Sequence, residues 1–135
     1  MPLASASLLL IARVLLAAMF LASGYSALSN IQATADYFGG LGLGPSVPLA
    51  WAVGLFELAA GILLVVGFQT RAVAAVLALF SLAATFLGHY GQGGDDPTAA
   101  FMHSQALLKD IAVAGGLIAL AVHGAGRLAV DGGRE

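Results

Sequence analysis

The chain has 135 residues, of which 60% are hydrophobic and only 9% are charged, and its mean hydropathy is +0.97. Soluble domains carry charge on about a quarter of their residues, so this composition excludes a soluble protein and indicates an all-α polytopic protein of the lipid bilayer. The net charge of −2, with no basic tract, argues against nucleic acid as a partner, and the absence of cysteine excludes thiol chemistry. Any redox chemistry must therefore come from a bound ligand or a partner protein.

Four apolar segments are long enough to span a bilayer, which requires about 20 residues of helix. They cover about residues 3–28, 49–67, 71–90 and 101–123. We therefore expect residues 1–124 to form a four-transmembrane-helix bundle and residues 125–135 to form a short cytoplasmic tail. No Lys or Arg precedes the first segment, and Arg13 lies inside it, so we interpret it as a retained span rather than a signal peptide.

The segments that connect the predicted spans contain residues typical of helix starts and helix ends. Residues 31–48 predict a short interfacial helix over 31–38, followed by a Gly- and Pro-rich turn. Gly67 is placed as the C-terminal glycine of the second span, and Thr70 as the N-cap of the third. Asp96 followed by Pro97 is typical of an N-cap and first helical position, which would start the fourth helix well before Ser104.

The basic residues predict the orientation of the bundle. Four spans place both termini on one side, and Arg71, Arg127 and Arg134 all fall on that side. The two longer connections on the opposite side contain no Lys or Arg. The positive-inside rule then predicts that both termini are cytoplasmic.

Four charged residues fall inside the spans, where each costs about 2.5 to 3.5 kcal/mol at the bilayer centre and requires a partner. Arg13 lies about 15 Å from one boundary and Glu57 about 12 Å from the other, so their levels nearly coincide in a core of about 30 Å. Lys109 and Asp110 fall in the same zone, but sequence neighbours on a helix point about 100° apart and cannot simply neutralise each other. We predict a buried site with Lys109 paired to Glu57 and Arg13 paired to Asp110.

Structural alternatives exist for each of these charges. The quartet could be only polar contacts between helices, Glu57 could be a satisfied core carboxyl, and Arg13 could extend toward the cytoplasmic surface. The helix faces favour convergence, because residues that allow close helix approach share the faces of the charges. These are Gly54 and Gly61 on the face of Glu57, and Gly116, with Gln105, on the face of Lys109.

Polar and aromatic residues gather near the outer ends of the spans. His89 and His103 lack any ligand spacing for metal or haem, so we expect neither; they are either interfacial hydrogen-bonded histidines or proton-transfer and quinone-oxygen groups. His89 continues a polar stripe from Ser81 and Thr85. The aromatic residues are typical of an interfacial belt, with ring stacking on a ligand as the alternative for Trp51 and Tyr90. They are Tyr37, Phe38, Trp51, Tyr90 and Phe101.

Several stretches together resemble the DoxX family of small four-helix membrane proteins. They are RVLLAAMFLASGYSAL from Arg13, the Tyr37–Phe38 pair, VGLFELAAGILLVVGFQTR from Val53, FLGHYG, ALLKDIAVAGG and GRLAVD from Gly126. The resemblance implies a bundle in the bacterial cytoplasmic (inner) membrane, redox or sulfur-handling partners, and quinone-linked oxidation of sulfur compounds as in the related DoxD branch. By position, the residues of this chain to which the family resemblance extends a functional role are Arg13, Glu57, His89, Lys109 and Asp110. Family members often have lysine where this chain has Ala27.

The leading hypothesis is therefore a subunit of a quinone-linked oxidoreductase, in sulfur-compound or oxidative-stress chemistry, with quinone as its cofactor. Lys109 and His89 would donate to the quinone carbonyls, and Glu57 or Asp110 would carry protons. The catalytic candidates are Glu57, Lys109 and Asp110, and the ligand-binding candidates are Arg13, Trp51, His89, Tyr90, His103 and Gln105. The alternatives are a non-catalytic scaffold or assembly factor for redox partner proteins and, third, a transporter of protons or a small solute, although no inverted repeat with broken helices is recognisable.

Overall fold

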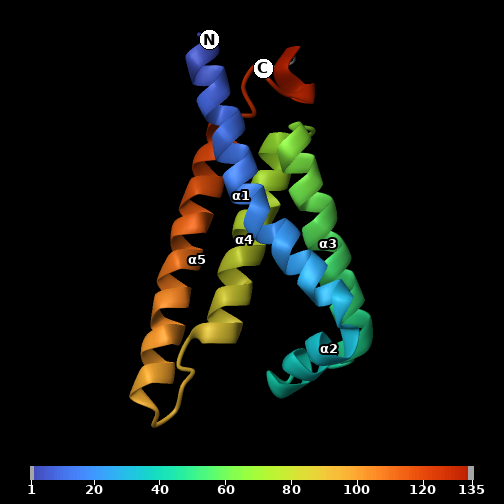
Figure 1. The fold of residues 1–135 in the computed structure, drawn as a ribbon, viewed down its shortest axis with the longest axis vertical. Coiled ribbons are helices and arrows are strands. Elements are labelled where there is room, and N and C mark those ends of the chain that lie inside the picture. Colours follow the sequence, from blue (N-terminus) through green and yellow to red (C-terminus); the bar gives the residue numbers. More distant parts are fainter. Residues whose placement is uncertain (1, 134–135) are drawn as a thin grey trace. The chain divides into compact units, whose positions relative to one another are not determined.

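The computed structural model describes residues 2–133, and no strand occurs among them. Figure 1 shows the helices in chain order. They are α1 (Leu3–Ser29), α2 (Ile31–Gly40), α3 (Ser46–Val66), α4 (Thr70–His89) and α5 (Pro97–His123), followed by a short 3-10 helix, η1 (Val130–Gly133). By length and composition α1, α3, α4 and α5 can each cross a membrane. The prediction of an all-α protein with four spans is therefore confirmed.

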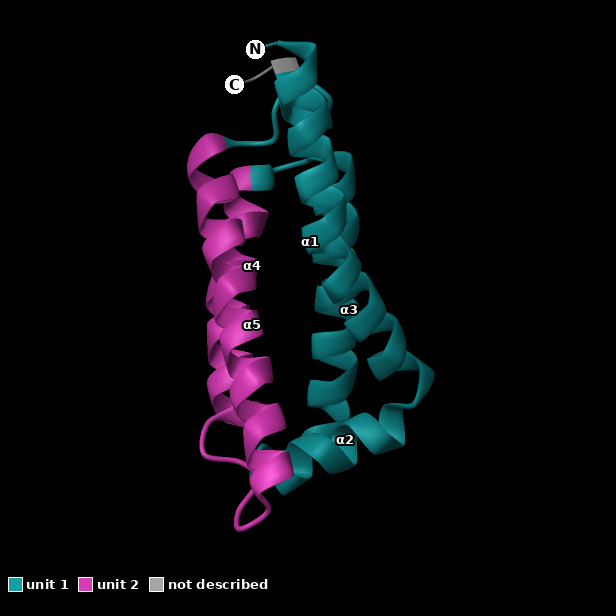
Figure 2. Ribbon diagram, turned by 60° about the vertical axis from the view of Figure 1, so that its left-hand side comes forward, with its two compact units in different colours: residues 1–70, 124–135 teal, residues 71–123 magenta. Residues whose placement is uncertain are grey.

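The chain divides into two compact units, which Figure 2 shows in different colours. Unit 1 comprises residues 1–70 and 124–135, and unit 2 comprises residues 71–123. Unit 1 thus contains α1, α2 and α3, whereas unit 2 is a hairpin of α4 and α5. The predicted spans match these helices to within a few residues, the largest differences being the earlier starts of α3 at Ser46 and α5 at Pro97.

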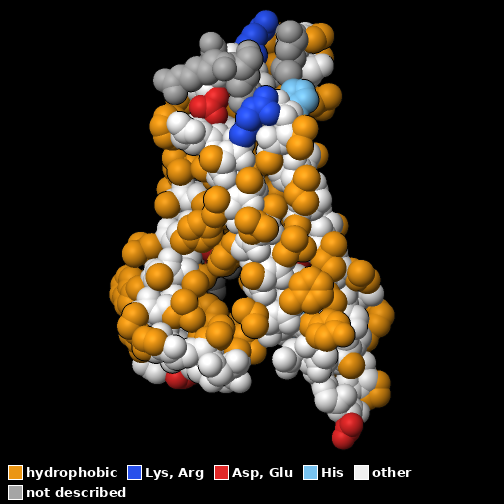
Figure 3. Space-filling model, turned by 180° about the vertical axis from the view of Figure 1, so that it is seen from behind, with side chains coloured by type: hydrophobic (Ala, Val, Ile, Leu, Met, Phe, Trp, Pro, Cys, Tyr) orange, Lys and Arg blue, Asp and Glu red, His pale blue; other side chains and the backbone are white. Residues whose placement is uncertain are grey.

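Large apolar side chains cover the outside of the long helices. Figure 3 shows hydrophobic side chains along the helices on the face that it draws. Leu15 on α1, Leu79 on α4 and Val122 on α5 are all highly exposed. Contiguous apolar surface of this kind is unfavourable in water and is favourable in hydrocarbon, so these faces are suited to contact with lipid.

Glycines determine how α1 packs against α3. A Cβ atom added at Gly24 would lie 2.9 Å from the Gly54 carbonyl oxygen and from the Leu58 backbone nitrogen. A Cβ at Gly54 would lie 2.7 Å from Leu28, and one at Gly61 would lie 2.8 Å from Leu21. Because only small residues allow such close approach, these three glycines set the separation of the two helices.

A short helix follows α1, as predicted, and extends two residues beyond the expected end. The Asn30 side chain accepts a hydrogen bond from the Ala33 N–H at 3.1 Å and so caps the start of α2. Ala35 is buried, and the helix ends at two glycines. Contacts of α2 with both α1 and α3 make it a part of unit 1.

The turn between α3 and α4 is closed by a residue from the far end of the sequence. Gly67 ends α3 in the left-handed conformation predicted for it, with φ of 73°. The prediction that Thr70 is the N-cap of α4 is wrong, because Thr70 is already the first helical residue. Asp131 supplies the cap instead, accepting from the Gln69 N–H at 3.0 Å and from the Thr70 N–H at 2.8 Å. The Asp131 carboxylate accepts from two N–H groups at once, and its negative charge is favoured at the N-terminal end of the helix dipole. It therefore takes the place of the predicted Thr70 hydroxyl cap.

The segment predicted as a cytoplasmic tail packs within unit 1 as far as residue 133, where the described part ends. Ala125 and Asp131 are buried. The Asp131 N–H donates to the Gly67 carbonyl at 2.9 Å, and Leu128 offers its carbonyl to the Arg13 Nη2 at 2.6 Å. The segment is thus a structural part of the helix bundle in unit 1.

Replacing Asp131 should destabilise the protein. We expect Asp131→Ala to lower the free energy of unfolding by about 1.5 to 3 kcal/mol, because charge-assisted hydrogen bonds to two backbone N–H groups are lost. Equilibrium unfolding in mild detergent, followed by circular dichroism, measures this change. Asp95→Ala is the matched control, since Asp95 is exposed and forms no hydrogen bond within the described chain. Equal stability of the two variants would contradict the capping role.

Alanine at Gly24 should separate α1 from α3. We expect Gly24→Ala to destabilise the protein by about 1 to 3 kcal/mol, because its methyl group would press against backbone atoms that cannot rotate away. Gly115→Ala on α5 is the control, since nothing lies within 4 Å of the added atom there. It should be neutral or raise stability by up to about 1 kcal/mol through helix propensity. The same unfolding experiment compares the two variants, and a stable Gly24→Ala protein would argue against close packing.

Candidate functional site

Arg71 joins the two helices of unit 2 at one end. Its guanidinium donates to the carbonyl of Val122 and, at 3.0 Å, to that of His123, at the end of α5. These carbonyls have no partner within their own helix, and the helix dipole favours a cation beside them. Arg71 therefore fixes the start of α4 against the end of α5, so the hairpin is antiparallel.

The opposite end of the hairpin is built from a cap and a histidine contact. Asp96 Oδ1 accepts from the Thr98 N–H at 3.0 Å and the Ala99 N–H at 3.3 Å, and Pro97 is the first residue of α5. The predicted N-cap is therefore confirmed. His89 lies about five whole turns after Arg71 on α4, so both residues face α5.

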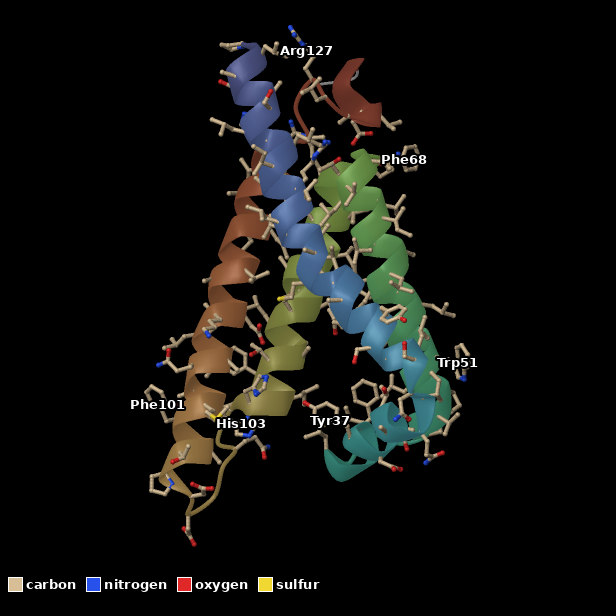
Figure 4. The ribbon with its side chains drawn as sticks, viewed as in Figure 1. Tyr37, Trp51, Phe68, Phe101, His103 and Arg127 are labelled. Carbon is tan, nitrogen blue, oxygen red and sulfur yellow. The ribbon has the colours of Figure 1, made fainter. Side chains whose placement is uncertain are left out.

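His89, His103 and Asp110 form what we call the histidine–aspartate cluster. The Nδ1 atoms of His89 and His103 lie 2.8 Å apart, a hydrogen-bond distance. The other nitrogen of His89, Nε2, lies 4.0 Å from Asp110 Oδ2, close enough for an ion pair when His89 is protonated. His103, labelled in Figure 4, and Asp110 lie two turns apart on α5. The structure thus brings together three of the residues selected from the sequence.

The cluster can hold its shared proton in two arrangements. A hydrogen bond between two imidazole nitrogens requires one Nδ1 to carry a proton and the other to accept it. In one arrangement, with both rings neutral, His89 keeps its proton on Nε2 toward Asp110, and His103 donates from Nδ1. In the other arrangement His89 donates from Nδ1, and His103 carries a proton on Nε2. Shifting between them moves a proton between the Asp110 side and the His103 Nε2 side.

Lys109 and Gln105 are not part of this cluster. Lys109 is exposed and forms no ion pair or hydrogen bond with any residue from 71 to 123. Its side chain leaves α5 about 100° from that of Asp110, as expected for neighbours on a helix. The predicted pairing of Lys109 with Glu57 joins residues of different units and stays a prediction.

Glu57 lies buried near the middle of α3, inside unit 1. It lies between Gly54 and Gly61, the glycines that pack closely on α1. Its carboxyl has the Ser23 hydroxyl of α1 as a hydrogen-bond partner. Ser23 was not among the residues selected from the sequence; its position directly before the helix-packing Gly24 is the signal that could have identified it.

Arg13 does not meet Glu57. Its fully buried guanidinium donates to the Leu128 carbonyl at 2.6 Å and lies so close to Gly67 that a Cβ there would clash with it. Gly67 is ten residues beyond Glu57, or about 15 Å along the helix. The side chain thus extends toward the end of unit 1 where α3 ends, but its guanidinium is buried in protein and does not reach the surface. There it holds α1, the end of α3 and the C-terminal segment together.

The predicted aromatic ligand residues are strongly exposed. Trp51 projects from the outer side of α3, as Figure 4 shows, and Tyr90 follows α4 with its ring 5.9 Å from that of Phe86. Both lie within about two turns of a helix end, where Trp and Tyr concentrate in membrane proteins. This placement favours the interfacial belt over ring stacking on a ligand.

Comparison with known proteins identifies the family of this chain. Residues 8–90 match the DoxX family, from within α1 to Tyr90, directly after α4. The chain belongs to the DoxX family. This DoxX protein is 30% identical over 125 residues to inner membrane protein YphA of Escherichia coli (strain K12), covering 92% of this chain and 88% of YphA. It is also 30% identical over 125 residues to inner membrane protein YqjF of the same organism, covering 90% and 88%. No solved structure matches the chain.

The histidine contact in this DoxX protein can be tested by nuclear magnetic resonance. With 15N-labelled histidine in detergent micelles, the Nδ1 atoms of His89 and His103 should show a scalar coupling, because the hydrogen bond connects them directly. His103→Gln should abolish the coupling, whereas His123→Gln should leave it unchanged. Two uncoupled Nδ1 resonances in the unmodified protein would contradict the contact.

Proposed function

We propose that this protein is the membrane subunit of a quinone-linked oxidoreductase and that the histidine–aspartate cluster binds the quinone headgroup. The observation that carries the proposal is the 2.8 Å contact between His89, at the end of α4, and His103, together with Asp110 at the middle of the membrane-spanning helix α5. Ionisable groups at such depth are costly and usually mark a proton or substrate route. A route for protons is what quinone chemistry requires of a protein.

The residues around His103 fit a quinone headgroup. A bound quinone supplies two carbonyl oxygens, which take up two protons with two electrons. His103 Nε2 has no hydrogen-bond partner among residues 71–123, so it is available as a donor to one carbonyl. Phe101 and Met102, directly before His103, are strongly exposed and offer apolar surface near the start of α5.

Proton delivery by the cluster can be written as three coupled transfers. His103 Nε2 gives its proton to the ligand oxygen, and His103 Nδ1 takes the proton carried by His89 Nδ1. His89 Nε2 then receives a proton from Asp110 once the two close from 4.0 Å to hydrogen-bond distance. The net result is one proton moved from Asp110 to the ligand, with both histidines left in the other tautomer. A second transfer needs Asp110 to be protonated again and both histidines to return to their starting tautomers, with a proton on His103 Nε2 and on His89 Nδ1.

Other residues selected from the sequence keep a proposed role outside this relay. Lys109 is the candidate donor to the second carbonyl, and Glu57, buried beside Ser23, is a second candidate proton carrier. The chain has no cysteine, so the electrons would come from a reduced sulfur compound or from a redox partner protein.

We also propose that both termini are cytoplasmic. The two relatives are inner membrane proteins by name, which supports the same membrane for this chain. Arg71 is the second residue of α4 and Arg127 follows α5, whereas the connections after α1 and α4 contain no Lys or Arg. Positive residues remain preferentially in the cytoplasm.

Quinone content is the decisive measurement. The protein purified in mild detergent should retain quinone near one molecule per chain, quantified by mass spectrometry of extracted lipids. His103→Gln should reduce it about tenfold or more, because leaving the quinone carbonyl without its hydrogen bond costs about 1 to 3 kcal/mol. His123→Gln is the matched histidine control and should retain the unmodified content.

The quinone measurement can also favour the alternative function of a non-catalytic scaffold. Absence of quinone from the unmodified protein, with stable co-purification of redox proteins that survives His103→Gln, would argue for a scaffold. In that case the histidine–aspartate cluster would serve only to hold α4 against α5.

A further inference from the structure

Two hydroxyl groups are buried in α4 without a partner. The Ser81 side chain is 4% exposed and the Thr85 side chain 1% exposed. Within the described residues, neither Ser81 Oγ nor Thr85 Oγ1 has a hydrogen-bond partner. Ser and Thr inside a helix commonly bond to the carbonyl of the preceding turn, and these two do not. Buried hydroxyls are normally satisfied, so this pair calls for an explanation.

The two hydroxyls and His89 lie along one side of α4. Each is four residues from the next, about 6 Å along the helix axis. Two successive hydrogen bonds of about 2.8 Å through one water molecule span nearly the same distance. Each gap in the stripe therefore has the length of a single bridging water.

The stripe lies on the buried side of α4. Ala74, Leu77, Ala78 and Gly88 are buried on the same side as the hydroxyls. Leu79, which is 70% exposed, points away from Ser81 by about 160° at nearly the same depth. One side of α4 is thus suited to lipid, while the other combines the hydroxyls with small residues and one buried leucine.

The stripe ends at the histidine–aspartate cluster. His89 is its last member, and the same ring contacts His103 and lies 4.0 Å from Asp110. A hydroxyl can accept a proton on one lone pair and release its own, so a row of hydroxyls and waters can conduct protons. A buried water needs about two to four polar partners, which the stripe and the cluster can supply.

We propose that Ser81, Thr85 and His89 line a narrow hydrated track that extends along α4 from the histidine–aspartate cluster and exchanges protons with it. Its role in supplying protons to a quinone rests on the proposed function, whereas the hydration itself does not. The track runs from the His89 end of the hairpin to Ser81, near the middle of α4. Its ligand is water, and the transferred species is the proton.

Substituted cysteines test the track directly, because the chain has no cysteine of its own. Ser81→Cys and Thr85→Cys place a thiol of nearly the original size at each hydroxyl. Silver ion, a small cation that is confined to water, is added to the protein in vesicles. The thiols that remain free are then counted with a fluorescent maleimide after denaturation. Leu79→Cys is the control, at the same depth on the lipid-facing side.

We expect silver to block both track positions more than about tenfold faster than Leu79→Cys, since an ion does not enter hydrocarbon. Adding Thr85→Val to Ser81→Cys should slow the blocking at position 81, whereas Thr85→Ser should not. The proposal is overturned if positions 81 and 85 stay as unreactive as position 79, or if all three react alike. No quinone takes part in this measurement, so hydration with no bound quinone would refute only the proposed function, and bound quinone with a dry stripe would refute only the track.

Discussion

Lipid offers no hydrogen bonds, so every polar group at membrane depth must be satisfied by the protein or by water that the protein admits. Helix ends contain most of the backbone groups that need such a partner, because the first four N–H groups and the last four C=O groups of each helix lack an intrahelical partner. In this protein, charged side chains satisfy several of them. Asp131 accepts from the start of α4, Asp96 from the start of α5, and Arg71 donates to the end of α5.

The need for hydrogen-bond partners also distinguishes charged residues that stabilise the structure from those that are candidates for function. Arg13 looks like an intramembrane charge in the sequence, yet its guanidinium reaches a carbonyl of the C-terminal segment at the end of unit 1. Glu57, with its serine partner, and the histidine–aspartate cluster do not serve helix ends in this way. They lie within or beside the spans and connect to other titratable or hydroxyl groups. These are the residues on which the proposed chemistry depends.

Local signals in the sequence predicted local structure well. Hydropathy located four spans, and the Asp96–Pro97 pair located the start of α5, because both signals arise from neighbouring residues. His89 and His103 were expected near the outer ends of two spans, but the contact between them was not predicted. The cap from Asp131 and the position of Arg13 could not be predicted in this way. Each depends on residues more than 60 positions apart, which leave no periodic pattern.

The carboxylate that caps α4 has a consequence for the order in which the protein is made. Asp131 follows Thr70 by 61 residues, and α4 and α5 are both synthesised before it. During membrane insertion the first N–H groups of α4 must therefore rely on water at the bilayer surface. Only when residue 131 has been synthesised can its carboxylate replace that water. The α3–α4 turn therefore gains this cap only after both α4 and α5 have been made.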